Sequence, residues 1–183
     1  SGVLSLDDIN NLESNGELGG SLELIQSQSV SGVGSCNFTS IKGNKYDVHL
    51  LEIINLFGAT DNTPTYLRFS NDGGSTYEAG TSYQYAFQNG GFGNGTFEEH
   101  RSTGTSAIFL GNNAGNGTNE SSNFYCYIYN ANNSSKYTFA THQGVFFYQQ
   151  ATAMVMAFGG GVYPTAETIN AFQILKGSGN ITS

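Results

Sequence analysis

Along most of this chain, apolar residues alternate with polar ones, which is the pattern of β-strands that bury one face. Between residues 65 and 70, Leu67 and Phe69 alternate with Arg68 and Ser70. Turn-forming residues follow at 71–74, and a second aromatic strand begins near residue 83. Since Asn, Asp and Gly tolerate the positive φ of a tight turn, we predict a β-hairpin over residues 66–87.

The same period of two predicts nine further strands and a tenth candidate at 96–102, which with the two hairpin strands makes about eleven in all. Turn signals separate them at short intervals, and no longer repeat occurs, so a propeller or solenoid is excluded. We therefore expect an all-β fold: an antiparallel, jelly-roll-like two-sheet sandwich over residues 21–183. An immunoglobulin-like sandwich is the alternative, disfavoured by the strand count and by the absence of tryptophan. The further strands are expected at 21–30, 36–41, 45–57, 96–102, 105–110, 123–131, 137–141, 145–148, 151–158 and 168–175.

The N-terminal segment, residues 1–20, has a different pattern. Ser5 and Asp8 have the spacing of a helix capping box, and several glycines close the segment. We predict a short helix or arm that packs on the domain or on a neighbouring subunit. Its apolar residues recur at roughly helical spacing: Leu4, Ile9 and Leu12.

Composition excludes some classes of partner. Charged residues make up 11% of the chain, well below the usual share of about 25%. The net charge is -8, and nowhere do lysines and arginines cluster as nucleic-acid binding or adhesion to an anionic membrane requires. No apolar run is long enough for a membrane-spanning helix. We expect neither nucleic acid nor membrane as a partner.

Cys36 and Cys126 are the only cysteines. Both fall in strand-like runs, which favours two buried free thiols. A disulfide between them is the alternative that the sequence leaves open, since it would close a long loop and stabilise the fold.

The densest ionisable cluster is Glu98, Glu99 and His100. On a strand, Glu98 and His100 share a face, which supplies two metal ligands but not three. No motif of nucleophilic, metal-dependent or phosphate-binding chemistry occurs, and nothing selects a pair of carboxylates for glycoside hydrolysis. We therefore expect no enzymatic activity, no cofactor and no metal.

The segment SNDGGSTY at 70–77 resembles the Asp-box of sialidase-like propellers, which stabilises a hairpin turn. Only one copy is present and the chain is too short for six blades. We therefore interpret Asp72, Gly73 and Gly74 as a turn brace, in which the carboxylate accepts backbone N–H groups.

Two sets of residues are candidates for binding. In the segment 123–131, apolar and polar residues alternate most regularly, and Tyr125, Tyr127 and Tyr129 lie on the face opposite its apolar residues. These tyrosines suit a protein interface, the packing of the second sheet or the stacking of a sugar. Two Asn- and Gly-rich loops form a candidate ligand site, with these residues: Phe92, Asn94, Asn113 and Asn116.

The order of four segments resembles a family of β-sandwich virion proteins of tailed phages, of the tail-fibre or head-decoration type found in marine and cyanobacterial phages. The segments are YDVHLLEIINL, LRFSNDGGSTY, YCYIYNA followed by KYTF, and AMVMAFGGG with the later TINAFQILKGSGNI. The resemblance covers about residues 21–182. It implies a non-enzymatic structural role in the virion and supplies no catalytic residues.

Segment 45–57 is apolar on both faces in its second half, beyond what one sheet face can cover. This suggests a central strand or one shared with another subunit. We expect a homo-oligomer, with a trimer implied by the family resemblance alone, in contact with other virion proteins. The alternative function is a carbohydrate- or host-receptor-binding module that takes a host-surface glycan.

Overall fold

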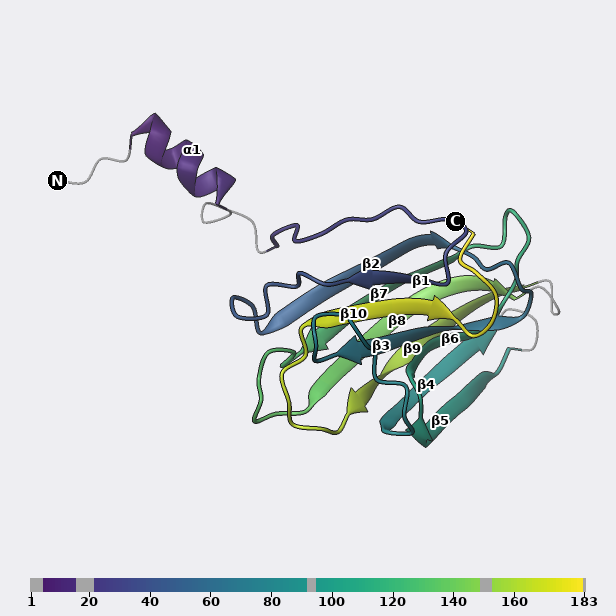
Figure 1. Cartoon of the computed structure of the whole chain (residues 1–183). Helices are drawn as coiled ribbons and strands as arrows, with labels where there is room; N and C mark the ends of the chain where they lie inside the picture. Colours follow the sequence, from purple (N-terminus) through teal and green to yellow (C-terminus); the bar gives the residue numbers. More distant parts are fainter. Residues whose placement is uncertain (1–4, 16–21, 92–94, 149–152, 183) are drawn as a thin grey trace.

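The computed structural model describes residues 5–15, 22–91, 95–148 and 153–182. Two antiparallel sheets pack against each other, as Figure 1 shows. The described part of the chain contains one helix and ten strands. They are α1 (Leu6–Ser14), β1 (Ser35–Phe38), β2 (Val48–Leu56), β3 (Thr63–Ser70), β4 (Tyr83–Gly91), β5 (Phe97–Thr105), β6 (Ile108–Ala114), β7 (Ser122–Tyr129), β8 (Thr138–Tyr148), β9 (Ala153–Tyr163) and β10 (Ala171–Lys176).

The strand pairing is nested, as in a long hairpin that has been rolled up. β1 pairs with β10, β2 with β7, β3 with β6 and β4 with β5, all antiparallel. The β8–β9 pair is inserted between β7 and β4, which widens one sheet to six strands in the order β2-β7-β8-β9-β4-β5. The other sheet has four strands in the order β1-β10-β3-β6. The predicted all-β, antiparallel two-sheet sandwich is confirmed, and the nested pairing is that of a jelly roll.

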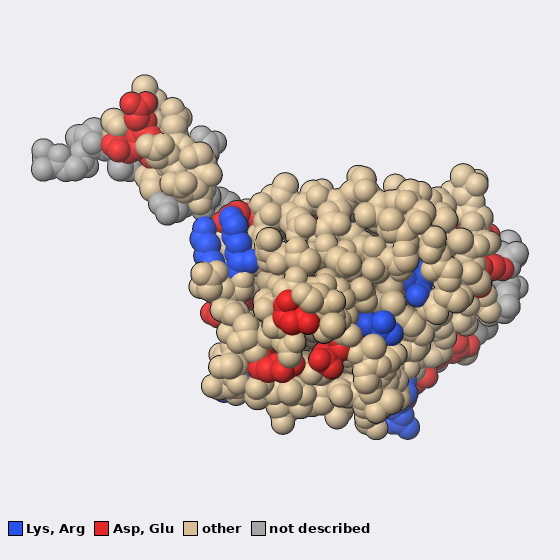
Figure 2. Space-filling view, viewed as in Figure 1, with Lys and Arg blue, Asp and Glu red and all other residues tan. Residues whose placement is uncertain are grey.

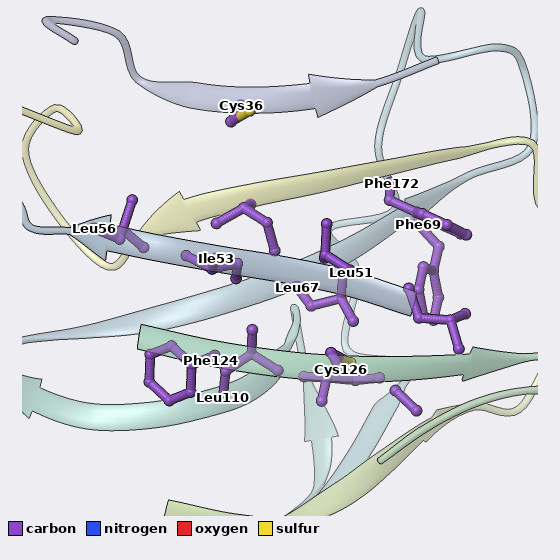
Figure 3. Close-up of a cluster of buried hydrophobic side chains, with 14 of the residues drawn as sticks. Cys36, Leu51, Ile53, Leu56, Leu67, Phe69, Leu110, Phe124, Cys126 and Phe172 are labelled. Atoms are coloured by element: carbon purple, nitrogen blue, oxygen red, sulfur yellow. The ribbon is translucent and has the colours of Figure 1, made fainter. Parts of the chain in front are cut away.

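The core fills the space between the sheets with side chains from alternate positions of both (Figure 3). Leu67 of β3 lies beside Leu51 of β2, and Leu110 of β6 lies beside Phe124 of β7. Cys36 and Cys126 are buried free thiols on different sheets, so the disulfide alternative is wrong. The predicted alternation of β7 is confirmed, with Phe124, Cys126 and Ile128 inside.

The predicted hairpin over residues 66–87 is wrong. β3 lies in the four-stranded sheet and β4 in the six-stranded sheet, so the two strands do not pair. Residues 71–82 form a connection that crosses from one sheet to the other. Turn residues mark where a strand ends, but they do not specify which sheet receives the next strand.

Two further strand predictions need correction. Residues 22–30 form no strand, and Leu22 and Leu24 are exposed. A side-chain hydrogen bond joins this segment to β1 instead of a strand ladder: Gln28 Nε2 donates to the carbonyl oxygen of Asn37 at 2.5 Å. The predicted strand over 45–57 is β2, an edge strand that pairs with β7 alone, so the central position is wrong.

The remaining strands differ from expectation in their ends. The segments 137–141 and 145–148 belong to one strand, β8, because His142 and Gly144 continue its alternation without a turn. β6 extends to Ala114, which is buried, so Asn113, predicted to lie in an Asn- and Gly-rich loop, belongs to a strand.

The capping box of α1 is confirmed. The Asp8 N–H donates to Ser5 Oγ at 3.1 Å, and the Ser5 N–H donates to the Asp8 carboxylate at 2.9 Å. In Figure 1 the helix stands apart from the sandwich, and Leu6 on its surface is 78% exposed. A helix of nine residues is marginal in water without a packing partner.

Candidate functional site

The broad side of the six-stranded sheet that faces away from the core carries an unusual number of large apolar side chains. We call this surface the outer face and define it by ten large apolar residues that point outward from β2, β7, β8 and β9. They are Val48, Leu50, Tyr125, Tyr127, Tyr129, Phe139, Val145, Met154, Met156 and Phe158, all exposed or half-buried.

Strand register places these residues side by side. Leu50 is opposite Tyr127, and Tyr129 is opposite Phe139, each in antiparallel pairs that share a face. In the centre of the sheet Phe139 is 45% exposed and Phe158 is 38% exposed. Neighbouring apolar side chains on one sheet face form a contiguous patch, and such patches mark interaction sites in soluble proteins.

Polar groups on the outer face hold its aromatic rings in place. Tyr125 Oη donates to Gln143 Oε1 at 2.7 Å, and its ring meets that of Tyr127 edge-on, with centroids 6.2 Å apart. Tyr129 Oη lies 3.3 Å from Thr141 Oγ1. The predicted tyrosine row therefore lies on the outer face rather than in the core. Rings fixed in this way contribute contact area with little loss of side-chain entropy.

Charge is sparse on this molecule. Figure 2, which has the same viewpoint as Figure 1, shows Lys, Arg, Asp and Glu in small separate groups on a largely uncharged surface. Lys42 and Lys45 both form ion pairs with Glu23, with Lys45 Nζ 2.9 Å from its carboxylate. No described helix is long and apolar enough to cross a bilayer.

A second candidate site is a cavity of about 270 Å³ between the sheets. The six-stranded sheet is wider than the sheet above it, and β6 is the edge strand that covers this end. The inner surfaces of β4, β5, β8 and β9 form one wall, and the end of β6 forms the other. The lining residues are Asn89, Gly91, Thr96, Glu98, Asn112, Asn113, Phe146, Tyr148, Ala153 and Val155.

Asn89 is the most buried polar residue in this lining, with 8% of its surface exposed. Its Nδ2 lies 3.1 Å from His100 Nε2, and its Oδ1 is buried without a hydrogen-bond partner among the described residues. His100 stacks on the ring of Phe87, with centroids 4.9 Å apart. The amide is thus held from one side by the imidazole, and its second polar atom is enclosed without a partner in the described structure.

The structure separates the residues of the predicted ligand site. Asn113 lines the cavity, and its φ of 58° places it in the left-handed region that asparagine tolerates. Asn116 lies outside the lining, and its amide donates to the Ala59 carbonyl at 3.2 Å. Phe92 and Asn94 lie outside the described residues.

The predicted interface residues are also separated. Tyr125, Tyr127 and Tyr129 lie on the outer face, whereas Ile9 and Leu12 belong to α1. Leu4 lies outside the described residues. The two groups are therefore not brought together within one chain.

The predicted turn brace surrounds Asp72. Its carboxylate accepts hydrogen bonds from the Thr76 N–H at 2.9 Å and from the hydroxyls of Thr76 and Ser70, both at 2.7 Å. These bonds stabilise the charged form and lower the pKa of Asp72 to about 2. Gly73 and Gly74 have φ values of 78° and 88°, which other residues rarely adopt.

The ionisable cluster on β5 does not form a chelating site. Glu98 and His100 share the inner face as predicted, with Glu98 Oε2 3.9 Å from His100 Nε2. Glu99 points to the other side and pairs with Arg101 at 3.1 Å. In the residues that the structure describes, no group of three or more potential metal ligands occurs.

Asn89 was missed by sequence reasoning. The alternation of Tyr83, Tyr85 and Phe87 continues onto Asn89, so the sequence places a polar residue at a core position. A polar residue in register with a buried aromatic row was the available signal.

Comparison with known proteins yields no match to a family model, to a curated protein or to a solved structure. The outer face, the cavity and the sequence resemblance are therefore the observations from which a function can be proposed.

Proposed function

We propose that this protein is a non-enzymatic, self-associating structural component of a virion, and that the outer face is its contact surface with a neighbouring copy. The observation that carries the proposal is the contiguous apolar and aromatic surface of β2, β7, β8 and β9. The virion context comes from the sequence resemblance to tailed-phage β-sandwich proteins.

The size of the outer face supports an interface between proteins. The four strands of the outer face, spaced about 4.8 Å apart and roughly eight residues long, cover a flat area of roughly 500 Å². A stable protein interface buries about 800 Å² on each partner, so the outer face supplies more than half of one such interface. A small ligand would cover only a fraction of it.

The chemistry of the face favours a second copy as the occupant. Its centre is uncharged, while the chain as a whole carries a net charge of -8. Copies that meet through this neutral surface keep most of their like charges apart. Tyrosine tips and glutamine amides supply hydrogen bonds at the same surface, as protein interfaces do. The resemblance implies a trimer, in which the face of each copy packs against another surface of its neighbour.

Sedimentation velocity of the full chain at micromolar concentration tests the proposal. We expect the wild-type protein to be a homo-oligomer. Phe139→Glu and Phe158→Glu each place a charge in the centre of the face, and we expect both to dissociate it. Ala79→Glu adds the same charge in the exposed β3–β4 connection and serves as the matched control.

The proposal would be contradicted if the wild-type protein sedimented as a monomer. Dissociation by Ala79→Glu to the same extent as by Phe139→Glu would also contradict it, because the effect would then reflect net charge and not the face. Circular dichroism of each variant confirms that the sandwich is folded before the result is interpreted.

A further inference from the structure

We propose that the cavity between the sheets binds a single neutral pyranose ring, either a free monosaccharide or the terminal residue of a glycan. This inference does not depend on the outer face, since the cavity is lined by the inner surfaces of β4, β5, β8 and β9 and by the end of β6.

The first argument is the buried amide of Asn89. With Nδ2 facing His100, the acceptor Oδ1 has no partner in the described part of the chain. With the amide turned the other way, the NH₂ group would be left instead. Buried polar groups are almost always hydrogen-bonded, and the enclosed atom of Asn89 gains a partner when the amide turns toward the cavity that this residue lines. A hydroxyl group can donate or accept, and it satisfies either orientation.

The second argument is the convergence of further polar groups on the same space. Asn112 and Asn113 enter from β6, and the structure records no side-chain hydrogen bond for either of them among the described residues. Glu98 of β5 lies at the exposed rim, with its carboxylate 3.9 Å from His100 Nε2. Amides and a carboxylate at several angles match adjacent hydroxyl groups, each of which donates one hydrogen bond and accepts others.

The third argument is the apolar part of the lining. Phe146 and Tyr148 of β8 and Val155 of β9 border the cavity. A pyranose ring has C–H-rich surfaces between its hydroxyl groups, and these pack on aromatic and aliphatic side chains. A mainly apolar wall with a few placed polar groups is the usual composition of a ligand site.

Charge and size narrow the class of ligand. The described lining contains no lysine or arginine and one carboxylate, so it disfavours phosphates and acidic sugars. The volume of about 270 Å³ equals roughly nine water molecules at about 30 Å³ each. It is just below the range of sites for larger ligands, which starts at about 300 Å³, so one ring fits and an oligosaccharide does not.

A titration of the ¹⁵N-labelled full chain tests the proposal by NMR. The probes are the methyl glycosides of glucose, galactose, mannose and N-acetylglucosamine, with methyl N-acetylneuraminate glycoside as the anionic probe. We expect at least one neutral glycoside to shift the backbone amides of Gly91, Asn112 and Asn113 in a saturable manner in the millimolar range. Disaccharides that end in the preferred sugar distinguish the sources: binding indicates the end of a glycan, and exclusion indicates a free monosaccharide.

Asn113→Gly removes one amide without backbone strain, because glycine adopts the same positive φ. We expect it to weaken binding roughly tenfold, as the loss of one good hydrogen bond does. Asn116→Gly makes the same change outside the cavity and should leave binding unaltered. Asn112→Ala is the second cavity variant, for use if Asn113→Gly does not fold.

Three results would overturn the proposal: no neutral glycoside causes saturable shifts at the cavity, the acidic glycoside binds at least as tightly as the neutral ones, or the cavity variants bind like the wild type.

Discussion

The hydroxyl of Tyr83 accepts a hydrogen bond from the backbone N–H of Phe69 at 2.9 Å, although the two residues lie on opposite sheets. Both residues are fully buried, and their rings are 6.0 Å apart. The β3–β6 ladder ends at Leu67, so Phe69 has no strand partner on that side. The Phe69 carbonyl accepts from the Glu78 N–H instead. The first residue of β4 thus satisfies the N–H group, and the β3–β4 connection satisfies the carbonyl, beyond the end of the ladder.

Tyr83→Phe should therefore lower the free energy of unfolding by about 1–3 kcal/mol, because it leaves the buried Phe69 N–H without an acceptor. Urea denaturation at neutral pH measures the change. Tyr85→Phe is the control, since the structure records no hydrogen bond for its hydroxyl among the described residues. Equal losses in the two variants would show that the hydroxyl of Tyr83 has no special role.

This connection also shows what the sequence could and could not predict about the fold. The alternation of Leu67 and Phe69 and the turn formers after Ser70 predicted β3 and its end. They could not predict that the next strand joins the other sheet, since strand pairing depends on contacts between distant segments. The same limit explains residues 22–30, where the pattern is that of a strand but no strand ladder forms.

The candidate sites were predictable in part for a similar reason. Local alternation placed Tyr125, Tyr127 and Tyr129 opposite the buried face of β7, and the register with β8 and β2 extended that row into a surface. The cavity joins four strands and the end of a fifth, and no local pattern encodes such a meeting point. Asn113 was identified from loop composition. Asn89 would have been identified by extending the inward-facing positions of β4 by two residues beyond Phe87.

Asp72→Ala should destabilise the protein at neutral pH, because the carboxylate accepts hydrogen bonds from Ser70 and Thr76. The pKa of Asp72 is lowered from 3.8 to about 2 in the folded protein. Its contribution is therefore complete above pH 3.8 and is lost as the pH falls through about 2. Thermal unfolding at a series of pH values should show the wild-type advantage shrinking over this window. Asp47→Ala removes an exposed carboxylate with no recorded side-chain hydrogen bond among the described residues and is the control for the loss of one negative charge. A pH-independent effect of Asp72→Ala would contradict the role of its charge.

His142 should make the fold sensitive to mild acid. Both of its ring nitrogens are buried without partners in the described structure, and burial lowers the pKa of the imidazole to about 4. The unfolded state binds a proton near pH 6.5, so stability falls as the pH drops from 6.5 to about 4. The total change is on the order of 3 kcal/mol. His142→Leu should remove most of this slope in denaturant unfolding, leaving the smaller share of His49, whose pKa is also lowered by burial. An unchanged acid profile in the variant would contradict the assignment.

Lys176 should make the stability of the fold depend on pH in the alkaline range. Its side chain is 3% exposed, its Nζ donates to Thr65 Oγ1 at 3.2 Å, and burial lowers the pKa of the amine from 10.5 to about 8. Between these two pH values the unfolded state binds more protons than the folded state, so this residue makes the fold more stable as the pH rises. The change is on the order of 3 kcal/mol between pH 8 and 10.5.

Burial raises the pKa of Cys126 to about 12, which has the reverse effect above pH 9, so the comparison must be made against a variant that keeps this thiol. Lys176→Met does so and keeps an unbranched side chain that is one atom shorter. The stability of the wild type relative to Lys176→Met should increase steadily across this range, and a constant difference would show that the buried amine does not titrate with folding.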